Sequence, residues 1–345
     1  MDTAMGLPAA KTVGLNEVPI IDLGAIRGGD PDARQALARE IAETCADIGF
    51  FYIVNHGIPS GRITEMFDAA RRFFALPPEA RAEVEMSKAT HYRGYIPIKT
   101  MSQKPQFQAS AAELKGNLYD AFQMHTEFAK NDPDVLNGKP LHWQNIWPSA
   151  MPDLKLVMES YFTEVSTLAH QMLKLFAIGL DLPETGLDHF FKKPLTQLRI
   201  IHYPPQPPND PGDTLGLRPH TDSGAFTILV QDQVGGLEIL PRGHTEWIQV
   251  PPLQDSYVIN LGEMMKVWSD GRLQATPHRV INRSGVERYS IPFFMTPQFD
   301  AEIKPIVKNP NPSDAPQFAT TVASGVTCGQ HLVSLYSRIW PVAEK

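Results

Sequence analysis

The sequence lacks the features of disulfide-rich, secreted and membrane-spanning proteins. It has only two cysteines, Cys45 and Cys328, among 345 residues. Two thiols are too few for a disulfide framework and indicate a reducing compartment. No apolar run approaches the roughly 20 residues that cross a bilayer, and the first residues lack the basic and then apolar pattern of a secretory signal. We therefore expect a cytoplasmic protein with no membrane partner.

Positive charge is also scarce. The chain has 31 lysines and arginines against 38 acidic residues, and its formal net charge is −7 at pH 7. The basic residues form no run, so we expect no nucleic-acid partner. The composition, 42% hydrophobic and 20% charged, is typical of globular proteins. The length allows a substantial core in one large domain or in two, and it does not predict the oligomeric state.

The N-terminal half mixes helices and strands. We expect residues 1–16 to form a flexible arm and 17–345 a single domain, in which 17–125 make an N-terminal α/β region. Branched and aromatic runs predict strands, and apolar residues at helical spacing predict helices. The expected strands are 18–23, 50–54 and 118–125, and the expected helices are 31–48, 59–75, 152–180, 186–191 and 331–340. Residues 79–110 and 131–148 are expected to be irregular.

From Leu195 onward the chain reads as short strands separated by glycine and proline turns. The expected strands are 198–203, 226–231, 237–240, 246–249, 256–260, 278–283 and 288–296. Short strands at such spacing indicate a double-sheet jelly roll, here over residues 195–300. Val234-Gly235-Gly236 predicts a hairpin turn or a bulge. The fold class is therefore mainly β, a jelly-roll core braced by the helices.

Three residues in this second half form a candidate metal site. His220 and Asp222 are two apart, so they would point to one face of an extended strand. His278 follows after enough chain to leave the sheet and return beside it. Two imidazoles and one carboxylate that leave other positions open are the ligand set of non-haem Fe(II) oxygenases. Each residue alone is a weak signal, and the prediction depends on their order and spacing together.

A second pair, Arg288 and Ser290, is also two apart and follows the third candidate ligand. Both side chains would lie on the same face of a strand. A guanidinium and a hydroxyl there could hold the far carboxylate of a bound oxo-acid through charge-assisted hydrogen bonds. By itself such a pair is more often found on a surface strand.

Taken together, these motifs resemble the 2-oxoglutarate/Fe(II)-dependent dioxygenases, and most closely the isopenicillin N synthase-like group. The similar segments are Val18-Pro-Ile-Ile-Asp-Leu, Gly49-Phe-Phe-Tyr-Ile-Val-Asn-His-Gly-Ile-Pro, Arg218-Pro-His-Thr-Asp-Ser-Gly, Thr227-Ile-Leu-Val-Gln-Asp, Val234-Gly-Gly-Leu, Ile259-Asn-Leu-Gly-Glu, Thr276-Pro-His-Arg-Val and Arg288-Tyr-Ser-Ile-Pro-Phe-Phe. They extend over about residues 18 to 340, nearly the whole chain.

The resemblance implies an enzyme that uses Fe(II), 2-oxoglutarate as cosubstrate and O2. It would couple oxidative decarboxylation of 2-oxoglutarate to hydroxylation, desaturation or ring closure of a small-molecule substrate. Arg288, Ser290 and Tyr203 would bind the 5-carboxylate of the cosubstrate, although Tyr203 could equally be a packed strand-end residue. No amino-acid nucleophile is needed, because the metal carries the difficult step.

The resemblance also directs attention to residues around the site. The related enzymes use the region of Tyr92-Arg-Gly-Tyr at the pocket mouth, and a surface loop is the alternative. Loops at 90–125 and the C-terminal segment would set specificity. Phe226, Phe293 and Phe294 are expected to pack inside the barrel rather than line the pocket. Arg279 and His56 are expected to be structural.

Three other functions stay open at this stage. Oxidases of the same fold, such as isopenicillin N synthase, use no 2-oxoglutarate but keep the Arg-x-Ser pair, and Cys328-Gly-Gln-His-Leu departs from the aromatic-rich form common near the end. A binding module would keep the fold and not the turnover. A zinc hydrolase would use two histidines and a carboxylate, but it lacks a candidate general base and leaves Arg288 unexplained.

Overall fold

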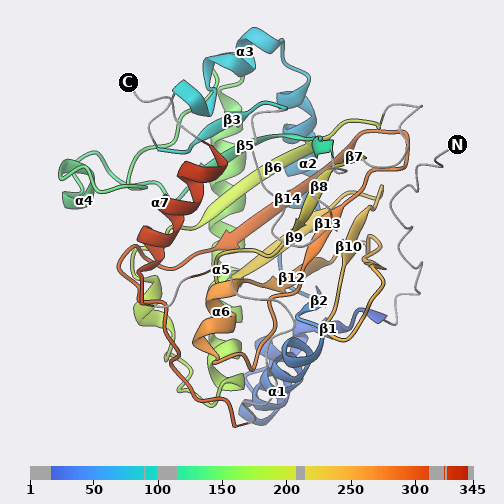
Figure 1. Ribbon diagram of the computed structural model, residues 1–345, viewed down its shortest axis with the longest axis vertical. Coiled ribbons are helices and arrows are strands. Elements are labelled where there is room, and N and C mark those ends of the chain that lie inside the picture. The colour runs from blue at the N-terminus through green and yellow to red at the C-terminus, as the bar shows by residue number, and fades with distance from the viewer. Residues whose placement is uncertain are drawn as a thin grey trace, which may run out of the picture.

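Two β-sheets enclose the centre of the molecule in the computed structural model, which describes residues 17–88, 91–98, 115–206, 214–310, 322 and 325–340 (Figure 1). The arm expected at 1–16 lies outside the described residues. The larger sheet has eight strands, in the order β1 (Ile20–Asp22), β2 (Phe50–Val54), β12 (Tyr257–Leu261), β9 (Phe226–Gln231), β14 (Arg288–Met295), β6 (Gln197–Tyr203), β5 (Asp120–His125) and β3 (Gly94–Ile96).

The smaller sheet has four strands and covers one face of the larger one. Its order is β11 (Ile248–Gln249), β10 (Leu237–Ile239), β13 (His278–Val280) and β8 (Leu217–His220). The short strands β4 (Lys115–Asn117) and β7 (Thr214–Leu215) pair separately in parallel. The chain passes repeatedly between the two main sheets, as in the expected jelly roll, and one core cluster fills the space between them.

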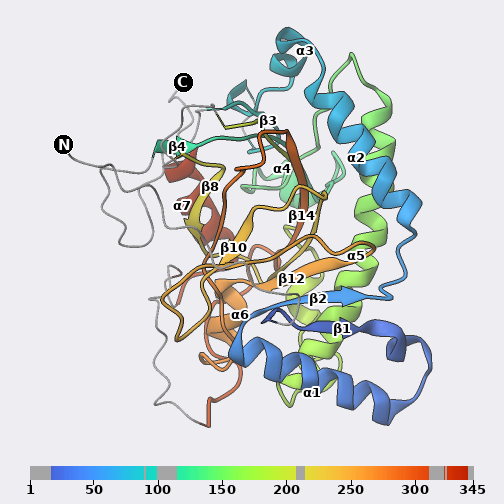
Figure 2. The same ribbon diagram turned by 90° about the vertical axis from the view of Figure 1, so that its right-hand side faces the viewer.

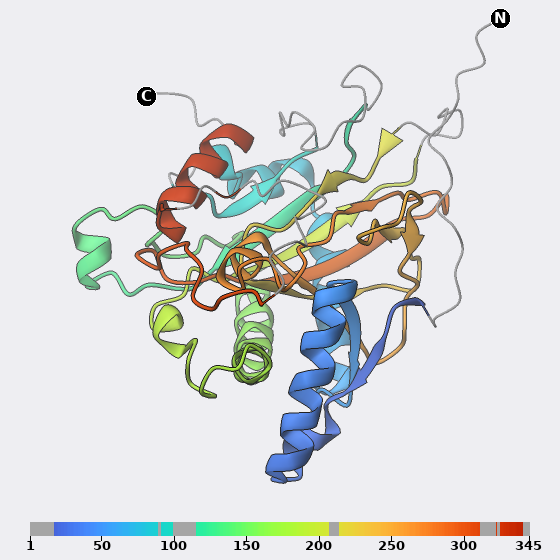
Figure 3. The same ribbon diagram turned by 60° about the horizontal axis from the view of Figure 1, so that its bottom comes forward.

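Three helices cover the opposite face of the larger sheet. They are α1 (Pro31–Asp47), α2 (Ser60–Phe74) and α5 (Asp153–Gly179). Figures 2 and 3 show them on one side of the strands, with α7 (Cys328–Ile339) on the other side. The apolar face of α5 buries a second core cluster against this sheet, as its helical periodicity predicts. Within the described residues, no helix combines the length and hydropathy needed to cross a membrane.

In the N-terminal region, local sequence features set where α1 begins and ends, and the strand that follows adds to the larger sheet. The side chain of Asp30 accepts a hydrogen bond from the Asp32 amide, and Pro31 occupies the first turn of α1. Gly49 ends this segment at φ +68°, where an added Cβ would lie 2.5 Å from the Gln274 carbonyl oxygen. The chain then enters β2, which pairs with β12 of the second half. The two halves of the sequence therefore share one sheet.

Several short elements differ from the expectations. The regions expected to be irregular contain α3 (Pro78–Glu83), the 3-10 helix Met86–Lys88, β3 and α4 (Pro133–Leu136), and α6 (Glu263–Trp268) was also missed. Elements of three to six residues are too short to show a period. The expected hairpin at Val234-Gly235-Gly236 is wrong, because β9 and β10 lie in different sheets. Both glycines have positive φ, which suits a tight crossing between sheets.

Candidate active site

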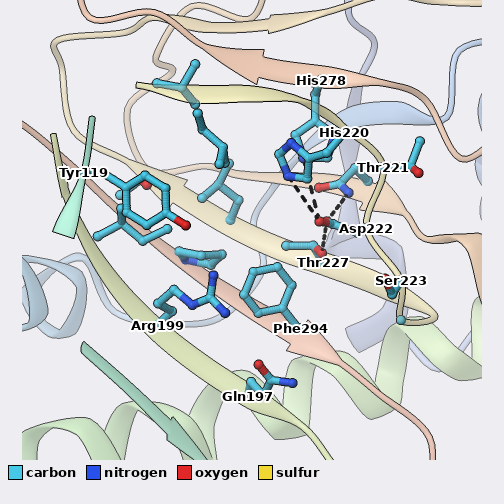
Figure 4. A pocket seen from close by; sticks show the side chains of 18 of the residues that line it. Tyr119, Gln197, Arg199, His220, Thr221, Asp222, Ser223, Thr227, His278 and Phe294 are labelled. Atoms are coloured by element: carbon cyan, nitrogen blue, oxygen red, sulfur yellow. Dashed lines mark hydrogen bonds and ion pairs between the residues drawn. The ribbon is translucent and has the colours of Figure 1, made fainter. Parts of the chain in front are cut away.

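Three side chains converge where the smaller sheet faces the larger one. His220 ends β8 and His278 begins β13, and the two residues are direct partners in the antiparallel pair. Their Nε2 atoms each lie 3.8 Å from Oδ1 of Asp222. One ligand atom from each of the three residues lies within 4.8 Å of the others, and Figure 4 shows them pointing toward one another. This separation suits a single metal ion between the three groups.

Asp222 does not lie in a strand, which corrects the expectation of a continuous strand from His220. The strand ends at His220, and Asp222 belongs to the loop that follows. Its Oδ2 accepts hydrogen bonds from Thr227 Oγ1 at 2.5 Å and Asn260 Nδ2 at 2.7 Å. Its backbone carbonyl accepts from the amide of Glu263 at the start of α6. These bonds turn Oδ1 toward the two imidazoles.

The histidine rings are oriented by the backbone beside them. Nδ1 of His220 lies 2.8 Å from the Arg218 carbonyl oxygen, and Nδ1 of His278 lies 3.2 Å from that of Thr276. A carbonyl only accepts, so each Nδ1 carries the proton and each Nε2 keeps its lone pair for a metal. In both candidate ligands the accepting carbonyl belongs to the residue two positions earlier in the chain.

Electrostatics favour the protonation states that bind a cation. Burial and the neighbouring His278 lower the pKa of His220 to about 4, so its imidazole is neutral near pH 7. Burial opposes ionisation of Asp222, but the two histidines and the hydrogen bonds from Thr227 and Asn260 outweigh it and hold the pKa of this carboxyl below its ordinary value. A neutral imidazole beside a carboxylate is ready for a divalent metal.

Arg288, Ser290 and Tyr203 line the same cavity. Arg288 is fully buried, and its guanidinium carbon lies 4.7 Å from the centre of the Tyr203 ring. Its Nε donates to the Gly235 carbonyl and its Nη2 donates to Gln231 Oε1 at 3.0 Å, while Nη1 is buried without a partner. In the described part of the chain no carboxylate pairs with this guanidinium. A buried cation with a free donor suits the carboxylate of a bound ligand.

The three phenylalanines divide between core and cavity. Phe226 and Phe293 pack against Phe176 and Phe162 of α5, with ring centres 5.0 and 5.3 Å apart. Phe294 instead lines the cavity. Alternation along β14 explains the split, because neighbouring residues of a strand face opposite sides. Packing inside the fold was therefore predicted correctly for Phe226 and Phe293 but not for Phe294.

Arg279 and His56 are structural, as predicted. Arg279 Nε lies 2.6 Å from Glu238 Oε2, both side chains are buried, and the guanidinium stacks on Trp247. His56 Nε2 lies 3.2 Å from the carbonyl oxygen of Asp255, and His56 does not line the cavity.

Sequence reasoning missed the side chains at the far side of the cavity. Arg199 and Gln197 of β6 and Tyr119 line it (Figure 4). The only available signal was a single arginine inside the apolar run Leu198-Arg-Ile-Ile. A further wall comes from α7, in the C-terminal segment that was expected to set specificity, and consists of Leu332, Leu335, Tyr336, Ile339 and the following Trp340.

The segment at 92–95 reaches this wall. The Tyr92 ring lies 5.2 Å from Tyr336 and 6.3 Å from Trp340, measured between ring centres. Its place beside two cavity-lining residues favours the pocket mouth over a plain surface loop. Residues 99–114, which belong to the segment expected to set specificity, lie outside the described residues.

Two family models match the chain. The N-terminal model of non-haem dioxygenases, described for morphine synthesis, matches residues 18–150. The 2OG-Fe(II) oxygenase superfamily model matches residues 195–297, which contain the three candidate metal ligands. The 2-oxoglutarate-Fe(II) type oxidoreductase hxnY of Emericella nidulans is 36% identical over 283 residues, which cover 81% of this chain and 79% of that protein. The chain belongs to the 2-oxoglutarate/Fe(II)-dependent oxygenases.

Solved structures of oxygenases share this fold. JOX2 in complex with 2OG, Fe and JA is 26% identical, with a TM-score of 0.71 over 96% of this chain and 88% of that one. A full-length protein of Neurospora crassa, solved in complex with alpha-KG and thymine, is 24% identical, with a TM-score of 0.75 over 93% and 96% of the two chains. The jelly-roll prediction is therefore confirmed.

The family assignment defines the reaction class. The oxygenase uses Fe(II), 2-oxoglutarate and O2 and couples decarboxylation of 2-oxoglutarate to oxidation of a second substrate. This assignment disfavours the oxidase, binding-module and zinc-hydrolase alternatives. The donor set fits the metal, since imidazole and carboxylate ligands that leave open positions suit non-haem Fe(II).

Proposed function

We propose that His220, Asp222 and His278 are the protein ligands of the ferrous ion. The proposal is supported by the 3.8 Å separations between the two Nε2 atoms and Asp222 Oδ1. It is also supported by the backbone contacts that fix both imidazole tautomers. Three ligands on one face leave room for the cosubstrate and O2 on the other.

We further propose that Arg288 and Ser290 bind the 5-carboxylate of 2-oxoglutarate. The single observation that carries this proposal is the fully buried Arg288 guanidinium, which has a free Nη1 and no carboxylate partner in the part of the chain that is described. Tyr203 lies directly opposite Arg288 in the β6–β14 pair, and its ring lies under the guanidinium. The proposed role of Tyr203 is to pack against this arginine and to offer its hydroxyl to the same carboxylate.

With this assignment, the chain's own residues bind the cosubstrate, orient the substrate and exclude water from the cavity. Bound iron, with 2-oxoglutarate and O2, supplies the oxidant for a C–H bond. Arg288 would hold the 5-carboxylate end of the cosubstrate, and the apolar residues of α7 together with Phe294 would keep water from the remaining space. We propose a small-molecule substrate, which is hydroxylated, desaturated or cyclised. We also propose that residues 17–345 act as one cytoplasmic oxygenase domain.

Anaerobic visible spectroscopy tests the proposed site. Fe(II) and 2-oxoglutarate added to the purified protein are expected to give a weak charge-transfer band, because the keto acid binds the metal directly. The band should be lost in His220→Ala. The exposed His244 provides a matched control, and His244→Ala should keep the band.

The cosubstrate assignment has its own test. Arg288→Gln removes the charge and should raise the Kd of 2-oxoglutarate at least tenfold, as expected for a lost charge-assisted pair, while Fe(II) binding stays intact. Bound iron with no charge-transfer band in the unmodified protein would contradict the proposal and favour an oxidase that binds another carboxylate.

A further inference from the structure

A second guanidinium, that of Arg199, faces the cavity and has no role in the proposed cosubstrate site. Its Nε donates to Gln123 Oε1 at 3.0 Å. The guanidinium carbon lies 5.2 Å from the centre of the Phe294 ring and 5.6 Å from that of Trp340. In the described residues, neither Nη atom has a hydrogen-bond or carboxylate partner. The end of the guanidinium is thus held in place with its donors available to a ligand.

Strand register separates Arg199 from the proposed cosubstrate arm. Arg288 is paired with Tyr203, which is four positions along β6 from Arg199, or about 13 Å at ~3.3 Å per residue. The proposed metal ligand Asp222 accepts a hydrogen bond from Thr227 of β9. Strand β14 lies between β9 and β6, so β9 and β6 are about 10 Å apart. Figure 4 shows Arg199 across the cavity from the three metal-facing residues. A cosubstrate that spans the metal and Arg288 leaves Arg199 to the second substrate.

Charge in the cavity points to the kind of substrate. Asp222 is the only acidic residue that lines it within the described part of the chain. Asp222 and the two carboxylates of 2-oxoglutarate balance the ferrous ion and Arg288, which leaves the charge of Arg199 without a counterion. The nearby His125 adds no positive charge, because burial and then Arg93 and Arg199 lower its pKa. A half-buried cation beside apolar walls favours an anionic ligand.

We propose that the substrate is a small carboxylic acid whose carboxylate binds the two Nη groups of Arg199. With Nε engaged by Gln123, these two nitrogens form a planar fork that matches a carboxylate. The body of the acid lies against Phe294 and the apolar side of α7, which places a C–H bond toward the metal. This inference rests on the proposed function, and it adds Arg199 as the residue that determines specificity for the anion.

Matched ligands and variants test the inference under anaerobic conditions. The protein loaded with Fe(II) and 2-oxoglutarate is titrated with acids and their amides, namely 3-phenylpropionate, hexanoate and octanoate against the corresponding amides. Calorimetry and the change in the charge-transfer band report binding without turnover. We expect at least one acid to bind tenfold or more tightly than its amide. Arg199→Gln should remove that preference, and Arg199→Lys should restore part of it.

Each outcome has a distinct meaning. Equal binding of acids and amides, or no binding of any acid, would overturn the inference. An equal loss for acid and amide in Arg199→Gln would also overturn it and indicate a packing role between Phe294 and Trp340. Failure of the proposed function is recognised separately, because the charge-transfer band with 2-oxoglutarate alone would then be absent from the unmodified protein. Thermal unfolding of each variant confirms that the chain is folded.

Discussion

At the scale of single residues, the oxygen of Asp222 that faces the metal site is set by bonds to its other oxygen. Thr227→Val removes one of those bonds at a buried position and keeps the side-chain shape. We expect metal affinity to fall by about 10- to 100-fold, as for other residues that orient a ligand. Titration with Mn(II) measures this. Thr163→Val, which removes an exposed hydroxyl of α5, is the control and should leave affinity unchanged.

A second prediction concerns the buried ion pair between Arg279 and Glu238, whose side chains are only 3% and 2% exposed. Glu238→Gln would leave a buried guanidinium without this carboxylate and should lower the free energy of unfolding by about 3–5 kcal/mol. Urea denaturation measures the loss. Asp68→Ala breaks an exposed pair with Arg71 and should change stability by less than about 1 kcal/mol. Similar losses of unfolding free energy in both variants would contradict the expectation that the buried pair contributes more to stability than the exposed pair.

At this scale, sequence reasoning could predict residues that form a local spacing pattern, but it could not predict residues whose surroundings come from distant parts of the chain. His220, Asp222 and His278 could be predicted as a candidate metal site because their residue types and spacing form a recognisable chemical pattern. Arg199 could not, because one arginine in an apolar strand carries no such pattern. The position of the Arg199 guanidinium in the cavity depends on its contact with Trp340, which lies more than a hundred residues later in the chain.

At the scale of elements, the loop that carries Asp222 is fixed by its contact with the start of α6. An added Cβ at Gly262 would lie 2.2 Å from the Gly224 carbonyl oxygen and 3.0 Å from that of Asp222. Gly262→Ala must therefore move this loop, and we expect a loss of about 1–3 kcal/mol in stability together with weaker Mn(II) binding. In α2, Gly61 has nothing within 4 Å of an added Cβ, so Gly61→Ala should stabilise by up to about 1 kcal/mol. Thermal unfolding compares them.

Helix α7 begins with a capping box, in which Thr327 and Gln330 bond to each other's backbone amides. Thr327→Ala removes half of it and should weaken the helix by about 1 kcal/mol. Because α7 forms a cavity wall but holds none of the proposed cosubstrate residues, the Kd of bound acids should rise while that of 2-oxoglutarate stays the same. An equal rise for both ligands would contradict this separation of the two sites.

Element prediction succeeded where the pattern was long. The apolar stripe of α5 spans many turns, and its expected range of 152–180 agrees closely with Asp153–Gly179. By contrast, β3 and α6 are too short for periodicity and are formed by tertiary contacts. Gly94 of β3 illustrates this, since an added Cβ would lie 2.2 Å from the Val84 carbonyl oxygen, a close approach that the sequence does not reveal.

At the scale of the whole molecule, ligand binding should stabilise the fold by mass action. With Mn(II) present, 2-oxoglutarate at 100 times its Kd should add about 2.7 kcal/mol to the free energy of unfolding, seen as a higher Tm. In Arg288→Gln a tenfold higher Kd would lower the gain at the same concentration to about 1.4 kcal/mol, and a larger rise in Kd would lower it further. An unchanged gain would show that Arg288 is not needed for binding.

The fold class could be predicted from the sequence, but the order of the strands in each sheet could not. The alternation of short strands indicated two sheets, and the structure has them. The order of strands was not predictable, because pairing between β2 and β12 joins residues some 200 positions apart. Such a pair depends on the packing of the whole chain rather than on local sequence.

The side chains of strand β14 point alternately to the cavity and to the helices that cover the larger sheet. Arg288, Ser290 and Phe294 face the cavity, and Ile291 and Phe293 face the helices. Insertion of one residue would exchange these sets, so the strand tolerates substitution but not a change in length. Selection for a new substrate can therefore act on the cavity-facing Phe294 without disturbing the residues that hold the fold, while Arg288 and Ser290 are kept for the cosubstrate. This separation offers a rational choice of positions for a mutational library.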